Sequence, residues 1–402
     1  MGRSRRLAVV VAAGALVLSV AMGVRFTFGL YIGPVAHEHL VTVGLLSLAI
    51  ALQNLVWGLA QPLAGGATDK YGPVPIVAAG ALLYALGMVA VALHPDALAV
   101  VLGWGVLVGL GQACMTFAVV ISSVSRAADA AHRTTAVALV AAGGSLGQVL
   151  LVPIAQLAVN QAGFRSALFV MAIVVLATAP FGLLLRRRGA ATAAAAALSP
   201  VAATGTAIRT ALRDPNFLLL TAGFFACGYQ LAFMAVHLPG YLVACHVGAN
   251  VGAAALATIG FFNVIGSFGF GKAADRVPPQ LLLAWLYGAR ATATAAYLLI
   301  PISAASTLVF AVVMGLTWLG TVPLTNAVIA RLHGLPNLGA LFGVCFVGHQ
   351  LGGFLGALGG GLSLQWTGSY MPVWISTIVV GYIAALLNLP IKYAPRSAPL
   401  PA

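Results

Sequence analysis

Two arginines lie inside apolar runs that are long enough to cross a membrane. Arg25 stands in "AMGVRFTFGLY", within an apolar run over residues 7–32, and Arg290 stands in "LYGARATA". An arginine at the centre of a membrane helix costs about 2.5–3.5 kcal/mol on insertion scales, so it is rarely kept without a partner or a task. A guanidinium can bind a carboxylate through two parallel hydrogen bonds. Arg25 therefore either binds an anion, or snorkels outward or caps helix carbonyls.

Arg290 lies near the middle of a predicted helix over residues 280–300. Exposure to lipid would be costly, so we expect its side chain to turn inward, toward the helix over 250–270 or the helix over 304–329. Asn263 is one expected partner. A purely structural role and substrate binding both stay open for Arg290.

A second polar group lies in "FVGHQLGG", near the middle of a predicted helix over residues 338–363. Histidine changes charge near neutral pH, so His349 is the candidate for proton coupling or for a second contact to the anion, with Gln350 beside it. A structural histidine bonded between helices is the alternative. The other candidate substrate-binding residues are Asn54, Gln112, Tyr229, Gln230, Asn263 and Trp318.

The composition shows what kind of protein must position these residues. Of the 402 residues, 61% are hydrophobic and 6% are charged, against about 25% charged residues in soluble domains, so the chain is a membrane protein. The net charge of +13 is spread singly or in short groups between apolar runs, which excludes a nucleic-acid partner. The four cysteines show no metal-ligand spacing, so neither a metal nor a cofactor is expected.

The carboxylates are all predicted at helix ends or in loops. Exporters of lipophilic cations usually need a carboxylate buried in the membrane, and none is expected here. Buried positive charge without buried negative charge favours an anion. The expected partner is therefore a small organic anion, with a proton as candidate co-substrate. The acidic residues are Glu38, Asp69, Asp96, Asp129, Asp214 and Asp275.

Apolar stretches of about 20 residues, enough to cross ~30 Å of hydrocarbon, predict twelve transmembrane helices. The N-terminal stretch also has features of a signal peptide, but its apolar run continues to Ile32, so we expect a retained first helix. The predicted spans are residues 7–33, 43–64, 74–93, 98–122, 134–159, 165–185, 216–243, 250–270, 280–300, 304–329, 338–363 and 370–390.

The loops predict the orientation and the domains. Most of the nineteen basic residues fall in loops on one side of a strict alternation, and basic short loops mark the cytoplasmic side. Both termini are therefore expected in the cytoplasm, with the chain in a bacterial inner membrane as a monomer. Residues 186–214 read as a cytoplasmic linker between two six-helix bundles, 1–185 and 215–402.

The two halves repeat each other at an offset of 205 or 206 residues. The loop glycine Gly65 and the pair Asp69-Lys70 match Gly271 and the pair Asp275-Arg276. A same-sense repeat of six helices predicts two bundles related by an axis along the membrane normal.

On these motifs the chain resembles the major facilitator superfamily over its whole length. The resemblance implies an all-α membrane protein with twelve transmembrane helices in two six-helix bundles related by pseudo-two-fold symmetry, whose first, fourth, seventh and tenth helices line a central cavity. It also implies a cytoplasmic gate at Asp69, Lys70, Asp275 and Arg276, where the loop aspartate latches the bundles together. Pro73 and Val74 stand where the family usually has further basic residues.

The stretches "VRFTFGLY", "GGSLGQ" and "GFFNVIGSFGFGKAADR" resemble bacterial relatives of the monocarboxylate and oxalate/formate carriers. Those carriers typically have an arginine four residues after an Asp or Asn in the eighth helix, whereas this chain has Ser267 after Asn263. The usual carboxylate anchor is therefore absent, and the resemblance does not give the substrate.

The predicted function is a secondary active transporter, and not an enzyme, that moves a small organic anion, with a monocarboxylate preferred, by alternating access. The repeat places Gln230 opposite Arg25, so the two would hold the carboxylate from both sides. Tyr229 would help to orient the carboxylate, and His349 would carry the proton. The alternative is an efflux carrier for hydrophobic or neutral compounds in which the arginines are structural. The chain has no G-x-x-x-x-G-K-(S/T) loop, which argues against ATP-driven transport.

Overall fold

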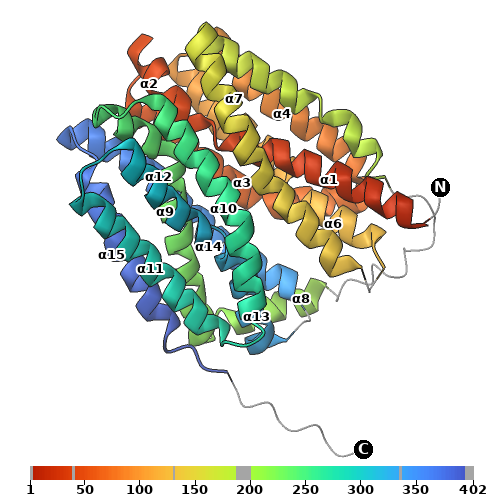
Figure 1. Cartoon of the computed structure of the whole chain (residues 1–402). Coiled ribbons are helices and arrows are strands. Elements are labelled where there is room, and N and C mark those ends of the chain that lie inside the picture. Colours follow the sequence, from red (N-terminus) through yellow and green to blue (C-terminus); the bar gives the residue numbers. More distant parts are fainter. Residues whose placement is uncertain (1–2, 39–40, 130–131, 187–200, 335–336, 394–402) are drawn as a thin grey trace, which may run out of the picture.

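The computed structural model describes residues 3–38, 41–129, 132–186, 201–334 and 337–393, and this part of the chain is helical throughout (Figure 1). About half of the predicted linker, residues 187–200 with Arg187 and Arg188, lies outside the described residues, as does Arg396.

The first half of the chain contains seven α-helices and two short helices of other types. Helix α7 has a non-helical residue, Gly163, with φ 76° and ψ 171°, so it consists of two straight segments. The elements are α1 Arg3–Arg25, α2 Phe28–Glu38, α3 Val43–Tyr71, α4 Pro73–Leu93, the π-helix η1 Ala99–Leu107, α5 Val108–Met115, α6 Phe117–Ala127, α7 Arg133–Leu176 and the 3-10 helix η2 Ala179–Leu183.

The second half follows with a short helix, α8, and then long ones. The elements are α8 Val201–Ala211, α9 Pro215–Ala244, α10 Ala249–Ala273, α11 Pro279–Leu299, α12 Ala304–Leu316, α13 Thr321–His333, α14 Leu338–Thr367 and α15 Met371–Asn388.

Three long helical segments are interrupted near their middles. The first break lies between α1 and α2 after Arg25, the second at Thr116 between α5 and α6, where φ is −115° and ψ is −150°, and the third over residues 317–320 between α12 and α13. A break leaves backbone N–H and C=O groups without helical partners, and at membrane depth side chains must satisfy them. The breaks are therefore where polar side chains are expected to gather.

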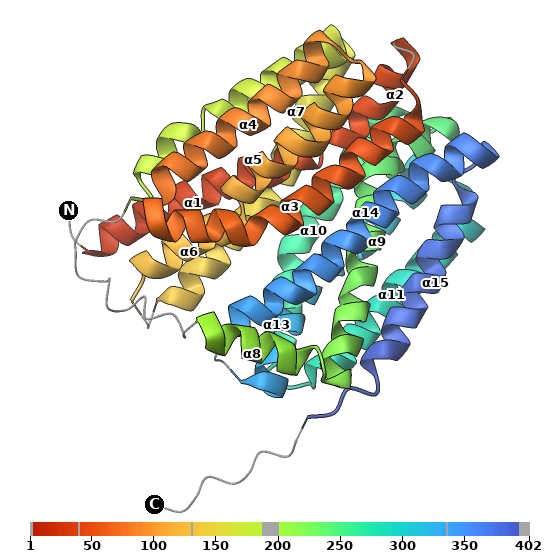
Figure 2. The same ribbon diagram turned by 180° about the vertical axis from the view of Figure 1, so that it is seen from behind.

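The two halves of the chain lie side by side and meet along a few helix pairs (Figures 1 and 2). The contacts join α3 to α14, α7 to α10, and α2 to α9. Glycines allow the closest approaches: a Cβ at Gly29 would lie 2.5 Å from the carbonyl oxygen of Ala235. Small residues at such crossings let membrane helices pack closely.

Ten helical segments are long and apolar enough to cross a membrane, counted by length and composition in the described residues. The segment Ala136–Leu183 counts once although Gly163 interrupts it, and α11, which carries Arg290, is not among the ten. The chain is thus an all-α, multi-pass membrane protein, while the twelve-helix count stays a prediction.

Candidate functional site

The first helix break places Arg25 beside two aromatic rings. Its guanidinium carbon lies 5.3 Å from the ring centroid of Phe26 and 5.1 Å from that of Trp57 on α3. Its Nη2 atom donates to Oδ1 of Asn54 at 2.6 Å. The side chain is only partly buried, and Asn54 is its one hydrogen-bond acceptor among the described residues. Because a guanidinium offers five N–H donors, most of its donors are free to bind something else.

Asn54 connects Arg25 to the second half of the chain. Its backbone carbonyl accepts a hydrogen bond from Nε2 of Gln350 on α14 at 2.9 Å. Oε1 of Gln350 lies 2.9 Å from Nδ1 of His349. An amide oxygen can only accept, so Nδ1 of His349 is the donor in this contact. Four of the predicted site residues thus form one hydrogen-bonded chain across the two halves.

Aromatic rings enclose His349 within this chain. Its ring is parallel to that of Phe346, with 6° between the planes and 5.7 Å between the centroids, and it lies 4.8 Å from Phe224 on α9. His349 is 8% exposed. The imidazole is therefore fixed in orientation by its neighbours while a small part of its surface stays accessible.

Arg290 is fully buried, and its guanidinium binds backbone carbonyls of the third helix break. Its Nη2 atom donates to the carbonyls of Thr317 and Trp318, the latter at 3.0 Å, and its Nη1 atom donates to Oε1 of Gln230 at 3.1 Å. The side chain turns inward toward residues 304–329 as expected, but its partners are backbone carbonyls rather than Asn263. Both Nη atoms are therefore already bound within the protein.

The expected pairing of Arg25 with Gln230 is wrong for this structure. Gln230 is fully buried; its Nε2 atom donates to the carbonyl of Thr377 on α15 at 3.0 Å, and its Oε1 atom accepts from Arg290. The repeat aligns Gln230 with Arg25 in sequence, but one residue step turns a helix by about 100°. Sequence alignment between the halves therefore does not determine which way each side chain faces.

Two further candidates form bonds within their own half. The hydroxyl of Tyr229 lies 2.7 Å from Oγ of Ser376 on α15, so the ring tip points toward α15. Nε2 of Gln112 on α5 donates to the hydroxyl of Tyr84 at 3.3 Å. The hydroxyl of Tyr84 in turn donates to the carbonyl of Ala21 on α1 at 3.3 Å, so Gln112 is connected to the helix that carries Arg25.

Asn263 and Trp318 lie at or near the third break. Oδ1 of Asn263 accepts from the backbone N–H of Leu319 at 2.9 Å, and its Nδ2 atom donates to Ser145 on α7 at 2.8 Å. The ring of Trp318 lies 6.4 Å from that of Phe26. Asn263 therefore ties the break to both halves, and Trp318 extends from the break to the neighbour of Arg25.

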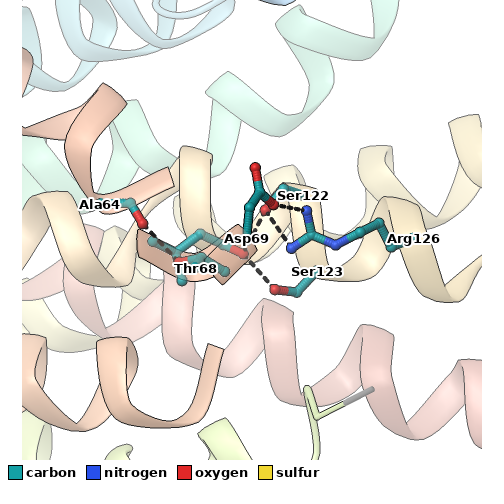
Figure 3. Close-up of polar contacts among 7 residues, drawn as sticks. Ala64, Thr68, Asp69, Ser122, Ser123 and Arg126 are labelled. Atoms are coloured by element: carbon teal, nitrogen blue, oxygen red, sulfur yellow. Dashed lines mark hydrogen bonds and ion pairs between the residues drawn. The ribbon is translucent and has the colours of Figure 1, made fainter. Parts of the chain in front are cut away.

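The loop motif of the first half forms an ion pair (Figure 3). Nη1 of Arg126, near the end of α6, lies 2.5 Å from Oδ1 of Asp69, and its Nη2 atom donates to Oγ of Ser122 at 3.2 Å. The ammonium of Lys70 lies 4.9 Å from the ring centroid of Tyr71. This ion pair does not form the expected latch between the bundles, because both of its partners belong to the first half.

The second copy of the motif repeats this arrangement in outline. Asp275 and Arg276 are exposed. Arg331, near the end of α13, donates to the carbonyl of Ala274 at 3.2 Å. Arg331 stands 205 residues after Arg126, so in both halves an arginine from the later helix binds the repeated loop.

Sequence reasoning missed Trp57 and Thr116. Trp57 contacts Arg25, and its indole Nε1 donates to Oγ1 of Thr116 at 2.8 Å, which ties α3 to the second break. A signal was present, because Trp57 follows Asn54 by three residues and so lies on the same helical face. The break at Thr116 had no such signal, since neither Gly nor Pro marks it.

The guanidinium of Arg25 with its free donors, the broken helices and the two facing halves define a multi-pass membrane protein with a polar site between its halves. The model of the Major Facilitator Superfamily matches residues 14–357, and the chain belongs to this family. The family consists of transporters rather than enzymes, so a small-molecule substrate is implied.

Relatives extend over most of the chain. It is 26% identical to the uncharacterized MFS-type transporter YcxA of Bacillus subtilis, over 91% of this chain and 90% of that protein. It is 27% identical to monocarboxylate transporter 13 of Bos taurus, over 88% and 82%. It is 23% identical to the fujikurins efflux protein of Gibberella fujikuroi, over 81% and 68%.

A solved structure has the same fold. A bacterial homolog of the human lysosomal transporter Spinster, in an inward-facing and occupied conformation, superposes with a TM-score of 0.76. The alignment covers 96% of this chain and 98% of that chain at 13% identity.

Proposed function

We propose that this chain is a secondary active transporter that moves a small organic anion, a monocarboxylate, by alternating access. The carrying observation is Arg25, a partly buried guanidinium at a helix break whose one described acceptor is the neutral oxygen of Asn54. A carboxylate would replace that neutral acceptor by a charged one, and charge-assisted hydrogen bonds are roughly twice as strong as neutral ones. The relatives named as monocarboxylate transporters support this substrate class.

A substrate with one carboxylate is favoured over a substrate with two. The Nη atoms of Arg290 are bound to Gln230 and to the carbonyls of the third break, so they do not offer a second anion site. A second carboxylate on the substrate would have to lose its hydration without a matching cation. This argument supports a monocarboxylate rather than a dicarboxylate.

The proton is assigned to His349. Its Nδ1 atom donates to Gln350, which holds Asn54 by a hydrogen bond between the halves. Separation of α3 from α14 during the transport cycle would break the contact of Gln350 with Asn54 and change the surroundings of the imidazole. Proton binding and movement of the halves would thereby be linked.

The topology completes the proposal. We infer twelve crossings, with Gly163 dividing α7 into two spans and α11 counted as a span, in bundles formed by residues 1–185 and 215–402. Both termini and the linker over residues 186–214 would lie in the cytoplasm of a bacterium, with the chain acting as a monomer in the inner membrane. The loop motifs at Asp69, Lys70, Asp275 and Arg276 would form the cytoplasmic gate.

Uptake into proteoliposomes tests the transport proposal. Labelled carboxylates are offered to the purified full chain with and without an inward proton gradient. The proposal expects saturable uptake that the gradient stimulates and that Arg25→Gln lowers by about a hundredfold. The exposed Arg6 supplies the matched control, because Arg6→Gln removes the same charge outside the site. Normal uptake by Arg25→Gln would contradict the assignment of Arg25 to the binding site.

The second candidate is efflux of hydrophobic or neutral compounds, which the resemblance to the fujikurins efflux protein favours. In that case Arg25 would be structural and carboxylates would not compete for transport. A resistance profile of cells that lack the gene, together with transport that excess carboxylate leaves unchanged, would favour this candidate.

A further inference from the structure

Partly exposed aromatic rings from both halves gather beside Trp57. The ring of Phe117 on α6 lies 6.3 Å from Trp57, and that of Phe346 on α14 lies 5.4 Å from it. The centroids of Phe117 and Phe346 are 6.4 Å apart, and Phe342 lies 6.3 Å from Phe346. Trp57 itself is buried, whereas the three phenylalanines keep part of their surface exposed.

These rings lie between the halves rather than toward lipid. Phe117 and Phe346 belong to different halves and contact each other, and Phe346 also stacks on His349. Phe268 on α10 serves as a comparison, because it is 75% exposed, as a side chain that faces lipid would be. The accessible ring surface therefore adjoins the hydrogen-bonded chain that includes His349.

Charge and apolar surface meet at Trp57. Its ring contacts both the guanidinium of Arg25 and the two phenylalanines. The hydroxyl of Thr116, at the start of α6, is already used, because it donates to the carbonyl of Gln112 at 2.7 Å and accepts from Trp57. The one proton of this hydroxyl is therefore already used, while Phe117 and Phe346 keep part of their apolar surface exposed beside it.

We propose that the anion bound by Arg25 carries an apolar body of about the size of a benzene ring, as in an aryl monocarboxylate, and that Phe117 and Phe346 contact this body. The inference rests on the proposed function and specifies its substrate class. Burial of a phenyl group stabilises a complex enough to change affinity by at least about tenfold. Ring edges and faces also favour an aromatic body over an aliphatic one of equal area.

The test compares three probes on the purified full chain. Phenylacetate and acetate share the carboxylate and differ in the ring, and 2-phenylethanol keeps the ring without the charge. Binding is measured as the rise in unfolding temperature during titration, since a ligand of the folded state raises its apparent stability. We expect phenylacetate to bind at least about tenfold more tightly than acetate, and 2-phenylethanol to bind no better than acetate.

Variants locate the ring contact. Phe346→Ala is expected to remove most of the preference for phenylacetate over acetate, with Phe117→Leu as the second, milder variant. Phe268→Ala, which changes an exposed phenylalanine outside the site, should keep the full preference.

The outcomes separate the two proposals. Equal affinity for acetate and phenylacetate would overturn the aryl inference and leave the monocarboxylate transporter standing. A preference that survives both Phe346→Ala and Phe117→Leu would also overturn it. Failure of every carboxylate to bind, or binding of 2-phenylethanol as tight as that of phenylacetate, would overturn the proposed function and the inference together.

Discussion

The two arginines that lie within apolar runs, Arg25 and Arg290, have different environments. Arg290 is fully buried and donates to two backbone carbonyls and to Gln230. Arg25 is partly buried, rests against two rings and donates to one neutral side chain. The same residue type therefore closes a helix break in one half and keeps free donors beside a break in the other. The accepting partners, rather than the cost of the charge, distinguish a structural arginine from a binding one.

The largest effect is expected when the structural arginine is removed. Arg290→Met leaves the carbonyls of Thr317 and Trp318 and the amide of Gln230 without their donor, and each buried polar group left unpaired costs about 1–3 kcal/mol. The free energy of unfolding should fall by about 3 kcal/mol or more. Thermal unfolding in detergent measures this change, with Arg6→Met as the control. Equal unfolding temperatures for the two variants would contradict the structural role.

Removal of the binding arginine should show the opposite pattern. Arg25→Gln is expected to lower carboxylate uptake by about a hundredfold, because two charge-assisted hydrogen bonds are lost. Its unfolding temperature should stay within a few degrees of the unmodified chain, since only the bond to Asn54 and the contacts with the rings of Phe26 and Trp57 are lost, and no backbone carbonyl loses its donor. Arg25→Lys should restore part of the uptake, because it returns the charge without the bidentate geometry. A large loss of stability in Arg25→Gln would contradict this prediction, because Arg25 would then have a structural role like that of Arg290.

A smaller effect is expected at the histidine connected to Arg25. His349→Gln keeps a hydrogen-bond donor toward Gln350 but cannot take up a proton near neutral pH. Downhill uptake should continue, while stimulation by an inward proton gradient, expected to be several-fold, should disappear. Gradient-driven and downhill uptake are compared in the same liposome preparation. Undiminished stimulation would remove His349 from the proton pathway.

The smallest effect concerns an arginine outside the membrane core. The carboxylate of Asp69 is 47% exposed and Arg126 is 26% exposed, and such exposed ion pairs are worth at most about 1 kcal/mol. Arg126→Gln should therefore change the free energy of unfolding by less than about 1 kcal/mol. Thermal unfolding at low and high salt checks this, because an exposed pair is screened by salt. A loss as large as that of Arg290→Met would contradict the ranking of the arginines.

The family was predictable from the sequence, because the loop motifs and the repeat depend on residue identity and spacing alone. The residues that link Arg25 to His349 were predictable from the sequence, but the hydrogen bonds between them were not. Asn54 and Gln350 meet only when α3 packs on α14. Gln230 was paired with Arg25 but binds Arg290 and Thr377 instead, because the repeat aligns residues along a helix without fixing its rotation. The break at Thr116 was missed, because neither Gly nor Pro marks it in the sequence.

The side chains that bind the third break restrict how this segment can move. Residues 317–320 are held by Arg290 from α11 and by Asn263 from α10, so we expect this segment to move as a rigid piece. The first break is held mostly by local bonds, such as Thr27 to the carbonyl of Val24, and by the exchangeable contact of Arg25 with Asn54. Bending should therefore be asymmetric, with amide hydrogen exchange faster at residues 25–28 than at residues 317–320, and slowed at the former by a bound carboxylate.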